Sequence, residues 1–229
     1  LLALRLPRLG TCESCPSELL KATMKLQKET ELSQNPHGRW YNDACGTAFG
    51  MELIGERWSL LIVRELMLGG RRFSDIRASL PGISAKVLTE RLESLEAGGA
   101  LIKRKLPPPA AAQVYELTQW GYLAEPIIQE LGRWAATSVH HDPTLPLSPV
   151  SLMLSLRTML DKEKAKTFDA TVGFEVGGES FVAELKEGKL PIRRGEIGDA
   201  DLVLRAPAAP LLAAVFYRKI PWEDLAGEG

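Results

Sequence analysis

Hydrophobic residues recur with a helical period through the first half of the chain. One stripe runs from Met51 to Leu68, and it consists of Ile54, Trp58, Leu61, Ile62 and Leu66. Spacings of three and four residues are typical of an amphipathic helix. Two shorter stripes follow at residues 73–80 and 84–97, and we expect Ser74 and Ser84 to cap the N-termini of these helices.

The period then changes to that of strands. Residues 101–105 and 113–117 are predicted to form two strands, joined by a segment rich in proline and alanine. A helical stripe returns at residues 118–138 and contains Ile127, Ile128, Leu131 and Trp134. The order of helix, helix, sharp corner, helix, two-stranded hairpin and helix predicts a winged helix-turn-helix domain.

The second half has a different pattern. Residues 140–147 have the composition of a linker. Beyond them we expect one helix at 152–160, a later helix around Leu211–Phe216, and strands at 171–176, 180–185, 189–193 and 201–204. The fold class is therefore α+β, with a mainly α winged-helix domain at 39–139 and a smaller α/β domain with a curved, antiparallel-rich sheet at 148–229. Residues 1–38 are predicted to be a partly disordered extension and lead-in, because Met24 opens a plausible chain of its own and residues 30–38 are polar and contain a proline.

Composition and charge narrow the classes of function. The 229 residues are 45% hydrophobic and 25% charged, which is ordinary for a globular protein. No apolar run approaches the roughly 20 residues of a membrane span, and three cysteines are too few for a disulfide framework. We therefore expect a cytoplasmic protein without a membrane partner. Residues 71–105 contain eight basic and four acidic residues, whereas residues 168–229 contain seven basic and eleven acidic ones, so the middle of the chain is expected to meet a polyanion.

The helix predicted at 84–97 is the candidate DNA-reading element, because the major groove of B-DNA admits a helix. Its outward face carries Lys86, Glu90 and Glu93, with Thr89 at the margin. Contacts to phosphates would fix the register of the protein on the duplex. The candidates for such contacts are Arg71, Arg72, Arg77, Lys103, Arg104 and Lys105. The alternative is a small helical domain whose charged face is only solvated.

Three segments together resemble the HxlR-type family of winged-helix transcriptional regulators: "ACGTAFGMELIGERWSLLIVREL", "RRFSDIRASLPGISAKVLTERLESLEAGGALIKR" and "VYELTQWG". The resemblance covers roughly Cys45 to Ser138. It implies a homodimer whose terminal helices pair and whose two recognition helices meet the half-sites of a pseudo-palindromic double-stranded operator. The DNA-binding residues that it implies are Ser74, Ser84, Lys86, Thr89, Glu90 and Arg91. The wing tip, "PPPAAA", departs from the short polar tip of the family.

The end of the chain, "GKLPIRRGEIGDADLVLRAPAAPLLAAVFYRKIPWEDLAGEG", resembles a sterol carrier protein-type domain. The resemblance implies helices over a curved sheet that encloses an apolar cavity. Because the family continues with a further apolar stretch, the domain is expected to be truncated and to hold a shallow groove for a small hydrophobic effector. The candidate groove residues are Phe174, Phe181, Leu204, Leu212 and Phe216. The alternative is a solid core.

Two further sites are candidates. The predicted dimer interface consists of Trp40, Tyr41, Ile127, Ile128, Leu131 and Trp134, with a Trp134 that caps a monomer core as the alternative. Several HxlR-type proteins sense oxidants through a cysteine at the position of Cys45, so Cys45 is a candidate redox sensor. The charge of Asp43, two residues earlier, does not favour a thiolate, and the alternative for Cys45 is a buried small hydrophobe.

No catalytic or metal site is predicted. Cys12, Cys15 and His37 do not supply the four ligands of a structural zinc site. The sequence contains no phosphate-binding loop, dinucleotide fingerprint or supported Ser/His/Asp set, so neither an enzyme nor a cofactor is expected. The leading hypothesis is a DNA-binding transcriptional regulator modulated by a small apolar effector. The alternative is a lipid or acyl carrier that uses its winged helix for protein interaction.

Overall fold

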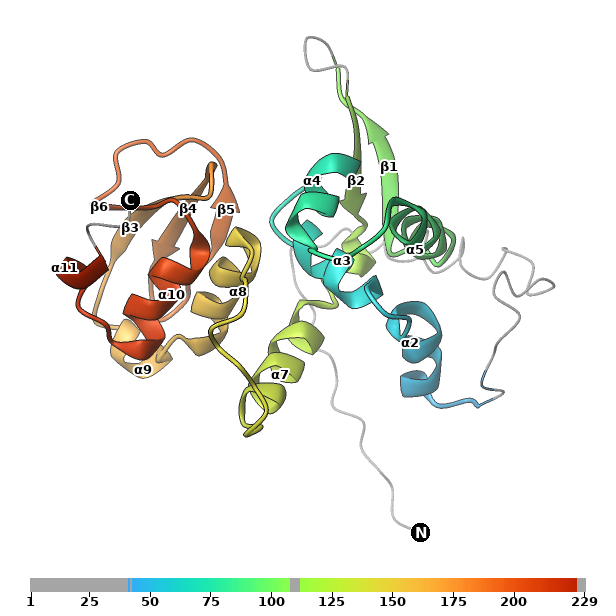
Figure 1. Cartoon of the computed structure of the whole chain (residues 1–229), viewed down its shortest axis with the longest axis horizontal. Helices are drawn as coiled ribbons and strands as arrows, with labels where there is room; N and C mark the ends of the chain where they lie inside the picture. Colours follow the sequence, from blue (N-terminus) through green and yellow to red (C-terminus); the bar gives the residue numbers. More distant parts are fainter. Residues whose placement is uncertain (1–40, 42, 108–111, 226–229) are drawn as a thin grey trace. The chain divides into compact units, whose positions relative to one another are not determined.

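The computed structural model describes residues 41, 43–107 and 112–225 (Figure 1). Its winged-helix half begins with two helices where the sequence predicted one, because α2 spans Gly46–Ile54 and α3 spans Ser59–Leu66. Trp58 lies between them with φ at +81°, a left-handed conformation that does not continue an α-helix. The chain also turns closely at Gly55, where a Cβ atom would stand 2.4 Å from the Met51 carbonyl oxygen. The prediction of a single helix from Met51 to Leu68 is therefore wrong.

The next two helices form the sharp corner that the sequence indicated. α4 spans Phe73–Ser79, and α5 spans Ala85–Ala97. Gly82 has φ at +91° in the turn between them, a conformation that favours glycine. The side chain of Ser84 accepts a hydrogen bond from the Val87 amide, so the predicted cap of α5 is confirmed.

Two boundaries in this half differ from the prediction. Arg72 rather than Ser74 precedes α4, and the Ser74 hydroxyl donates to the Asp75 carboxylate instead of capping the helix. The helix expected at 118–138 is divided into α6, Gln119–Tyr122, and α7, Glu125–Ala136. Pro126 lies in the first turn of α7, where its missing N–H leaves no helical hydrogen bond unmade.

The hairpin of the wing lies between α5 and α6. β1 spans Leu101–Lys105 and pairs antiparallel with β2, Gln113–Leu117. Leu101 and Leu117 stand opposite each other and are both buried, which fastens the base of the hairpin to the core. The prolines of the predicted wing tip at 108 and 109 lie outside the described residues.

The second half contains a four-stranded sheet in the order β5-β4-β3-β6. Only the β3–β6 pair is parallel, and it follows a crossover connection. The elements are α8 (Pro149–Met159), α9 (Lys162–Ala165), β3 (Ala170–Val176), β4 (Glu179–Leu185), β5 (Ile192–Arg194), β6 (Leu202–Ala206), α10 (Ala209–Arg218) and α11 (Trp222–Leu225). The strand predicted at 189–193 is thus shorter and later, because Pro191 has no amide to donate to the ladder.

One hydrophobic core runs through both halves. Helix α8 contacts α3 and α7 on one side and α10 on the other, and its residues Val150, Leu152 and Met153 are fully buried. The described residues from 41 onward belong to one compact unit. None of the helices in these ranges is long and apolar enough to cross a bilayer.

Candidate nucleic-acid interface

Helix α5 presents a polar face to solvent because its apolar face is held in the core. Leu88, Leu92 and Leu95 are at most 1% exposed. The opposite face therefore points outward, and its side chains Lys86, Thr89, Glu90 and Glu93 are all exposed. Lys86 Nζ lies 3.9 Å from Glu90, a surface contact of low energy that another partner could replace. An exposed polar face on a helix is the kind of surface that the major groove of B-DNA can admit.

Arg91 lies at the edge of this face and is already engaged. Its Nη2 atom lies 3.1 Å from the Glu56 carboxylate, and its Nε donates to the Arg57 carbonyl oxygen. Both acceptors lie in the turn that precedes α3. Arg91 therefore positions α5 against that turn, rather than extending freely towards a ligand.

The wing supplies most of the remaining positive charge. Lys103, Arg104 and Lys105 are exposed along β1. Lys103 lies 2.9 Å from Glu96, and the hydrogen bond between them raises the pKa of the lysine. Arg104 pairs with Glu116 across the hairpin. Arg72 and Arg77 are also exposed, at the start and in the last turn of α4.

Arg71 is only 7% exposed, whereas the adjacent Arg72 is exposed. Its Nη1 lies 3.0 Å from Glu65 and its Nη2 lies 2.9 Å from Glu179 of the second half. Glu65 is fully buried, and it also accepts hydrogen bonds from Arg64 and from the Ser148 hydroxyl. Arg71 thus joins the winged helix to the C-terminal half, and a phosphate could reach it only by breaking both ion pairs.

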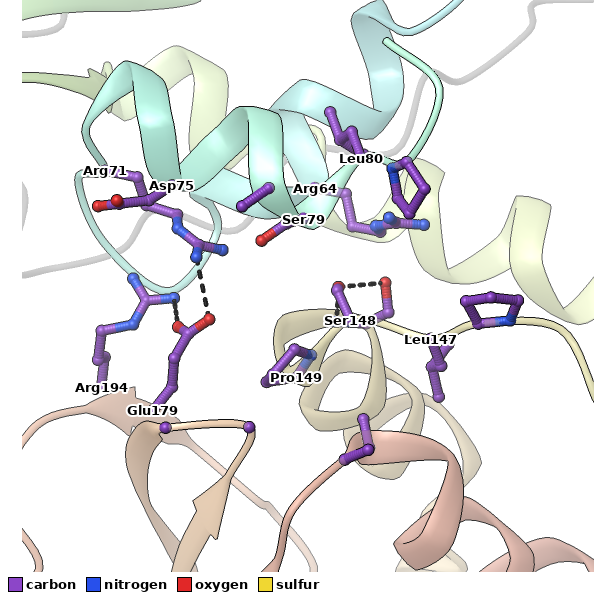
Figure 2. A pocket seen from close by; sticks show the side chains of 18 of the residues that line it. Arg64, Arg71, Asp75, Ser79, Leu80, Leu147, Ser148, Pro149, Glu179 and Arg194 are labelled. Atoms are coloured by element: carbon purple, nitrogen blue, oxygen red, sulfur yellow. Dashed lines mark hydrogen bonds and ion pairs between the residues drawn. The ribbon is translucent and has the colours of Figure 1, made fainter.

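A cleft of about 1030 Å³ opens where these ion pairs meet the surface. Figure 2 shows Arg71 and Arg194 both reaching the carboxylate of Glu179 at one end, with Ser148 and Pro149 of the α8 start opposite Ser79 of α4. The sequence did not indicate this cleft, because its walls come from segments far apart along the chain. None of the five candidate groove residues lines it.

The candidate groove residues lie instead in and around the core of the second half. Phe181, Phe174 and Leu212 are 0%, 4% and 9% exposed. Leu204 packs against the core as a partly buried residue, and Phe216 is 39% exposed. A ligand would contact Phe174 and Phe181 only by displacing packed side chains.

Helix α7 leaves apolar side chains in solvent. Trp134 is 73% exposed, Ile127 is 52% exposed and Leu131 is 44% exposed, whereas Ile128 packs against the core. Such exposure does not fit the alternative in which Trp134 caps the core of a monomer. Tyr41 is exposed as well, and Trp40 lies outside the described residues.

Cys45 is exposed, and it precedes the first turn of α2. The backbone amide and hydroxyl of Thr47, together with the Ala48 amide, lower the pKa of the thiol. The alternative of a buried small hydrophobe is therefore wrong. The nearby carboxylate of Asp43 accepts a hydrogen bond from the Cys45 backbone amide. Within the described ranges no group of three or more His, Cys, Asp or Glu side chains is placed to hold a metal ion, and Cys12, Cys15 and His37 lie outside them.

Known proteins are similar to the winged-helix half of this chain. Residues 53–143 match the family model described as HxlR-like helix-turn-helix. An 86-residue segment is 41% identical to YvaP of Bacillus subtilis, an uncharacterized HTH-type transcriptional regulator, and covers 37% of this chain and 79% of that protein. The chain belongs to the HxlR-like helix-turn-helix family. A second relative, the HTH-type transcriptional regulator YodB of B. subtilis, is 39% identical over 83 residues, which are 36% of this chain and 74% of YodB.

One solved structure also aligns with part of the chain. The reduced form of YodB from B. subtilis aligns with 44% of this chain and 100% of its own, at 33% identity and a TM-score of 0.39. The HxlR-like match ends at residue 143, just before the segment that leads into α8. The ion pair between Arg71 and Glu179 therefore connects the HxlR-like region to a part of the chain outside the family match.

We expect Arg71→Ala and Arg72→Ala to differ in their effect on the free energy of unfolding, although the two arginines are adjacent. Arg71→Ala leaves the fully buried Glu65 with only the partly exposed Arg64 as its cation and removes one of the two ion pairs of Glu179, so it should lower the free energy of unfolding by about 3 kcal/mol. Arg72 is exposed, so Arg72→Ala should change that free energy by less than about 0.5 kcal/mol. Urea unfolding of the two variants provides the measurement. Equal stability of Arg71→Ala and Arg72→Ala would contradict this role of Arg71.

We expect Cys45 to form a thiolate at lower pH than an ordinary cysteine does. A lowered pKa means that the thiolate is already present where a free thiol is still protonated, so alkylation by iodoacetamide should rise at lower pH. The rate is measured in a Cys12→Ser, Cys15→Ser background. Thr47→Val, which removes the hydroxyl, should move the pH profile of the alkylation rate back towards higher pH. A Cys45 profile that coincides with that of free cysteine would refute the assignment.

Proposed function

We propose that this chain is a sequence-specific, double-stranded DNA-binding transcriptional regulator. The observation that carries the proposal is the exposed polar face of α5, which stands opposite Leu88, Leu92 and Leu95 in a chain of the HxlR-like family. A helix held in this way can lay its N-terminal residues against base edges in the major groove. Ser84, Lys86, Thr89 and Glu90 are the residues proposed to do so.

The phosphate contacts come from the exposed cations that surround α5. Arg72 and Arg77 of α4 and Lys103, Arg104 and Lys105 of the wing are proposed to contact the backbone of the duplex, with Ser74 as a further donor. Arg71 has no part in this surface because its guanidinium is enclosed by Glu65 and Glu179. Arg91 acts as a positioning residue for α5 through Glu56.

The regulator is proposed to act as a homodimer on a pseudo-palindromic operator. The apolar side chains that α7 exposes, Ile127, Leu131 and Trp134, are suited to pair with the same helix of a second copy. Two recognition helices would then meet half-sites about one helical turn, or roughly 34 Å, apart.

The second half is proposed to modulate DNA binding and to be similar to sterol carrier protein-type domains. Its sheet is antiparallel apart from one pair and is packed by α8 and α10. The alternative function of lipid or acyl carrier is less well supported, since Phe174 and Phe181 lie in packed core.

Cys45 is proposed as a redox-sensing thiol because it is exposed at a helix start that lowers its pKa.

We expect the full chain to select a defined duplex from random sequences. Lys86→Ala should weaken discrimination between sites, because Lys86 faces the bases. Arg104→Ala should weaken binding to every sequence and reduce the slope of affinity against salt by about 1, because it contacts phosphate. Lys189→Ala, an exposed cation of the second half, serves as the control. No preference for any duplex over competitor DNA would contradict the proposal.

We expect Trp134→Ala to weaken the dimer by about 2 kcal/mol, or roughly 30-fold in dissociation constant, because a large aromatic anchor leaves the interface. Trp222→Ala is the matched control, since Trp222 is also exposed but lies on α11. Sedimentation equilibrium measures both. An unchanged dimer in Trp134→Ala, or a wild type that stays monomeric, would show that α7 has another role.

A further inference from the structure

One end of the cleft between α4 and the start of α8 is a cluster of buried and partly buried charged side chains in which positive charge exceeds negative charge. Arg64 and Arg71 share the carboxylate of Glu65, while Arg71 and Arg194 share the carboxylate of Glu179. Three guanidinium groups therefore surround two carboxylates, and the side chains of the three arginines are 7% to 25% exposed. One positive charge of this cluster has no counterpart within it.

Arg194 is the least satisfied of the three. Its Nη2 lies 2.7 Å from Glu179 without the geometry of a hydrogen bond, and its buried Nε has no acceptor among the described residues. The guanidinium lies over the Phe181 ring, 5.4 Å from the ring centre. Burial lowers the pKa of Arg194, and Arg71 adds to this effect, although Glu179 opposes it. A buried cation short of acceptors gains from an added anion.

The rest of the cleft is largely apolar. Trp58, Leu61 and Leu80 of the winged helix and Pro146 and Leu147 of the connecting segment contribute to its walls. A cleft of about 1030 Å³ is large enough for a small organic ligand. An apolar wall that ends at a cluster of arginines is complementary to a molecule with an apolar body and one anionic end.

We propose that this cleft binds a small carboxylic acid, whose carboxylate meets Arg194, the arginine of the cluster that lacks acceptors, and whose apolar body lies against Trp58 and Leu147. Asp75 and Glu196 also line the cleft, and both are exposed. Their charge opposes a second anionic group, so a monoanion is favoured over a phosphate or a polyanion.

The position of Trp58 connects this site to α5. Its indole Cη2 stands 3.9 Å from where a Cβ of Gly82 would lie, in the turn between α4 and α5. Arg57 lies over the same indole, and its carbonyl oxygen accepts from Arg91 of α5. A ligand that moves Trp58 would therefore move contacts of α5 at two places, the turn before its N-terminus and Arg91 in its middle. This step rests on the proposed function: binding of the acid changes the affinity of the chain for its operator. The coupling is reciprocal, so binding of the operator changes the affinity for the acid by the same factor.

The full chain is titrated calorimetrically with 3-phenylpropanoate and octanoate, which present an aromatic and an aliphatic body. The matched neutral probe is 3-phenylpropanamide and the matched cation is 3-phenylpropylammonium. We expect saturable binding of at least one acid and at least tenfold weaker binding of the amide and the ammonium. Arg194→Gln should lose at least tenfold in affinity, whereas Arg193→Gln, whose side chain is 60% exposed, should lose none. Leu147→Trp should weaken binding, because the larger indole takes up the space against Leu147 where the apolar body lies, without touching the ion pairs.

Several results would overturn the inference. One is no saturable binding of either acid up to about 10 mM, which corresponds to less than roughly 3 kcal/mol. Another is equal binding of acid and amide, and a third is full affinity in Leu147→Trp.

Fluorescence anisotropy of a selected duplex, with and without the acid, is recorded separately. Failure to bind any DNA would refute the proposed function while leaving acid binding measurable, whereas DNA binding without acid binding would refute only the inference drawn from the cleft.

Discussion

A single buried carboxylate, that of Glu65, determines how the two halves of this chain meet. Glu65 is fully buried in α3, and a charge in such a place is tolerated only when it is paired and hydrogen-bonded. Its partners come from three directions: Arg64 on the same helix, Arg71 beside the wing, and Ser148 at the start of α8. The Ser148 hydroxyl that donates to Glu65 also accepts from the Ser151 amide, so the cap of α8 and the charge of α3 depend on one another.

This constraint extends from the interior to the surface that is proposed to meet DNA. Arg71 exchanges backbone hydrogen bonds with Tyr115 of β2, so the residue that pairs with Glu65 also fixes one edge of the wing. Helix α3 packs against α5 as well as α8. Helix α5 and the C-terminal half therefore rest on the same helix, α3.

Those parts of the fold that depend on local pattern could be predicted from the sequence. The helix at 85–97 follows from the spacing of Leu88, Leu92 and Leu95, and its cap follows from Ser84. The break between α2 and α3 could not be predicted in this way, because Trp58 continues the apolar stripe although its backbone is left-handed.

The candidate site shows the same division. The exposed positions of Lys86 and Glu90 follow from helical period alone, whereas the burial of Arg71 depends on Glu179, which lies 108 residues further along the chain. Arg71 and Arg72 are identical in type and adjacent in sequence, and only the tertiary fold distinguishes them. One local signal was present: Glu65 interrupts an apolar run with a charge on the inward side of a helix.

Native-state hydrogen exchange on wild type and Glu65→Gln tests this account most directly, because it measures opening at each amide. The amides of Ile62 and Val63 in α3 and those of Leu152 and Met153 in α8 are the reporters, since all four residues are buried. If Glu65 joins the halves, the substitution lowers the free energy of opening by a similar amount in α3 and in α8. Loss of protection confined to α3, with α8 and the sheet unchanged, would show that the halves are stabilised independently and would contradict the account.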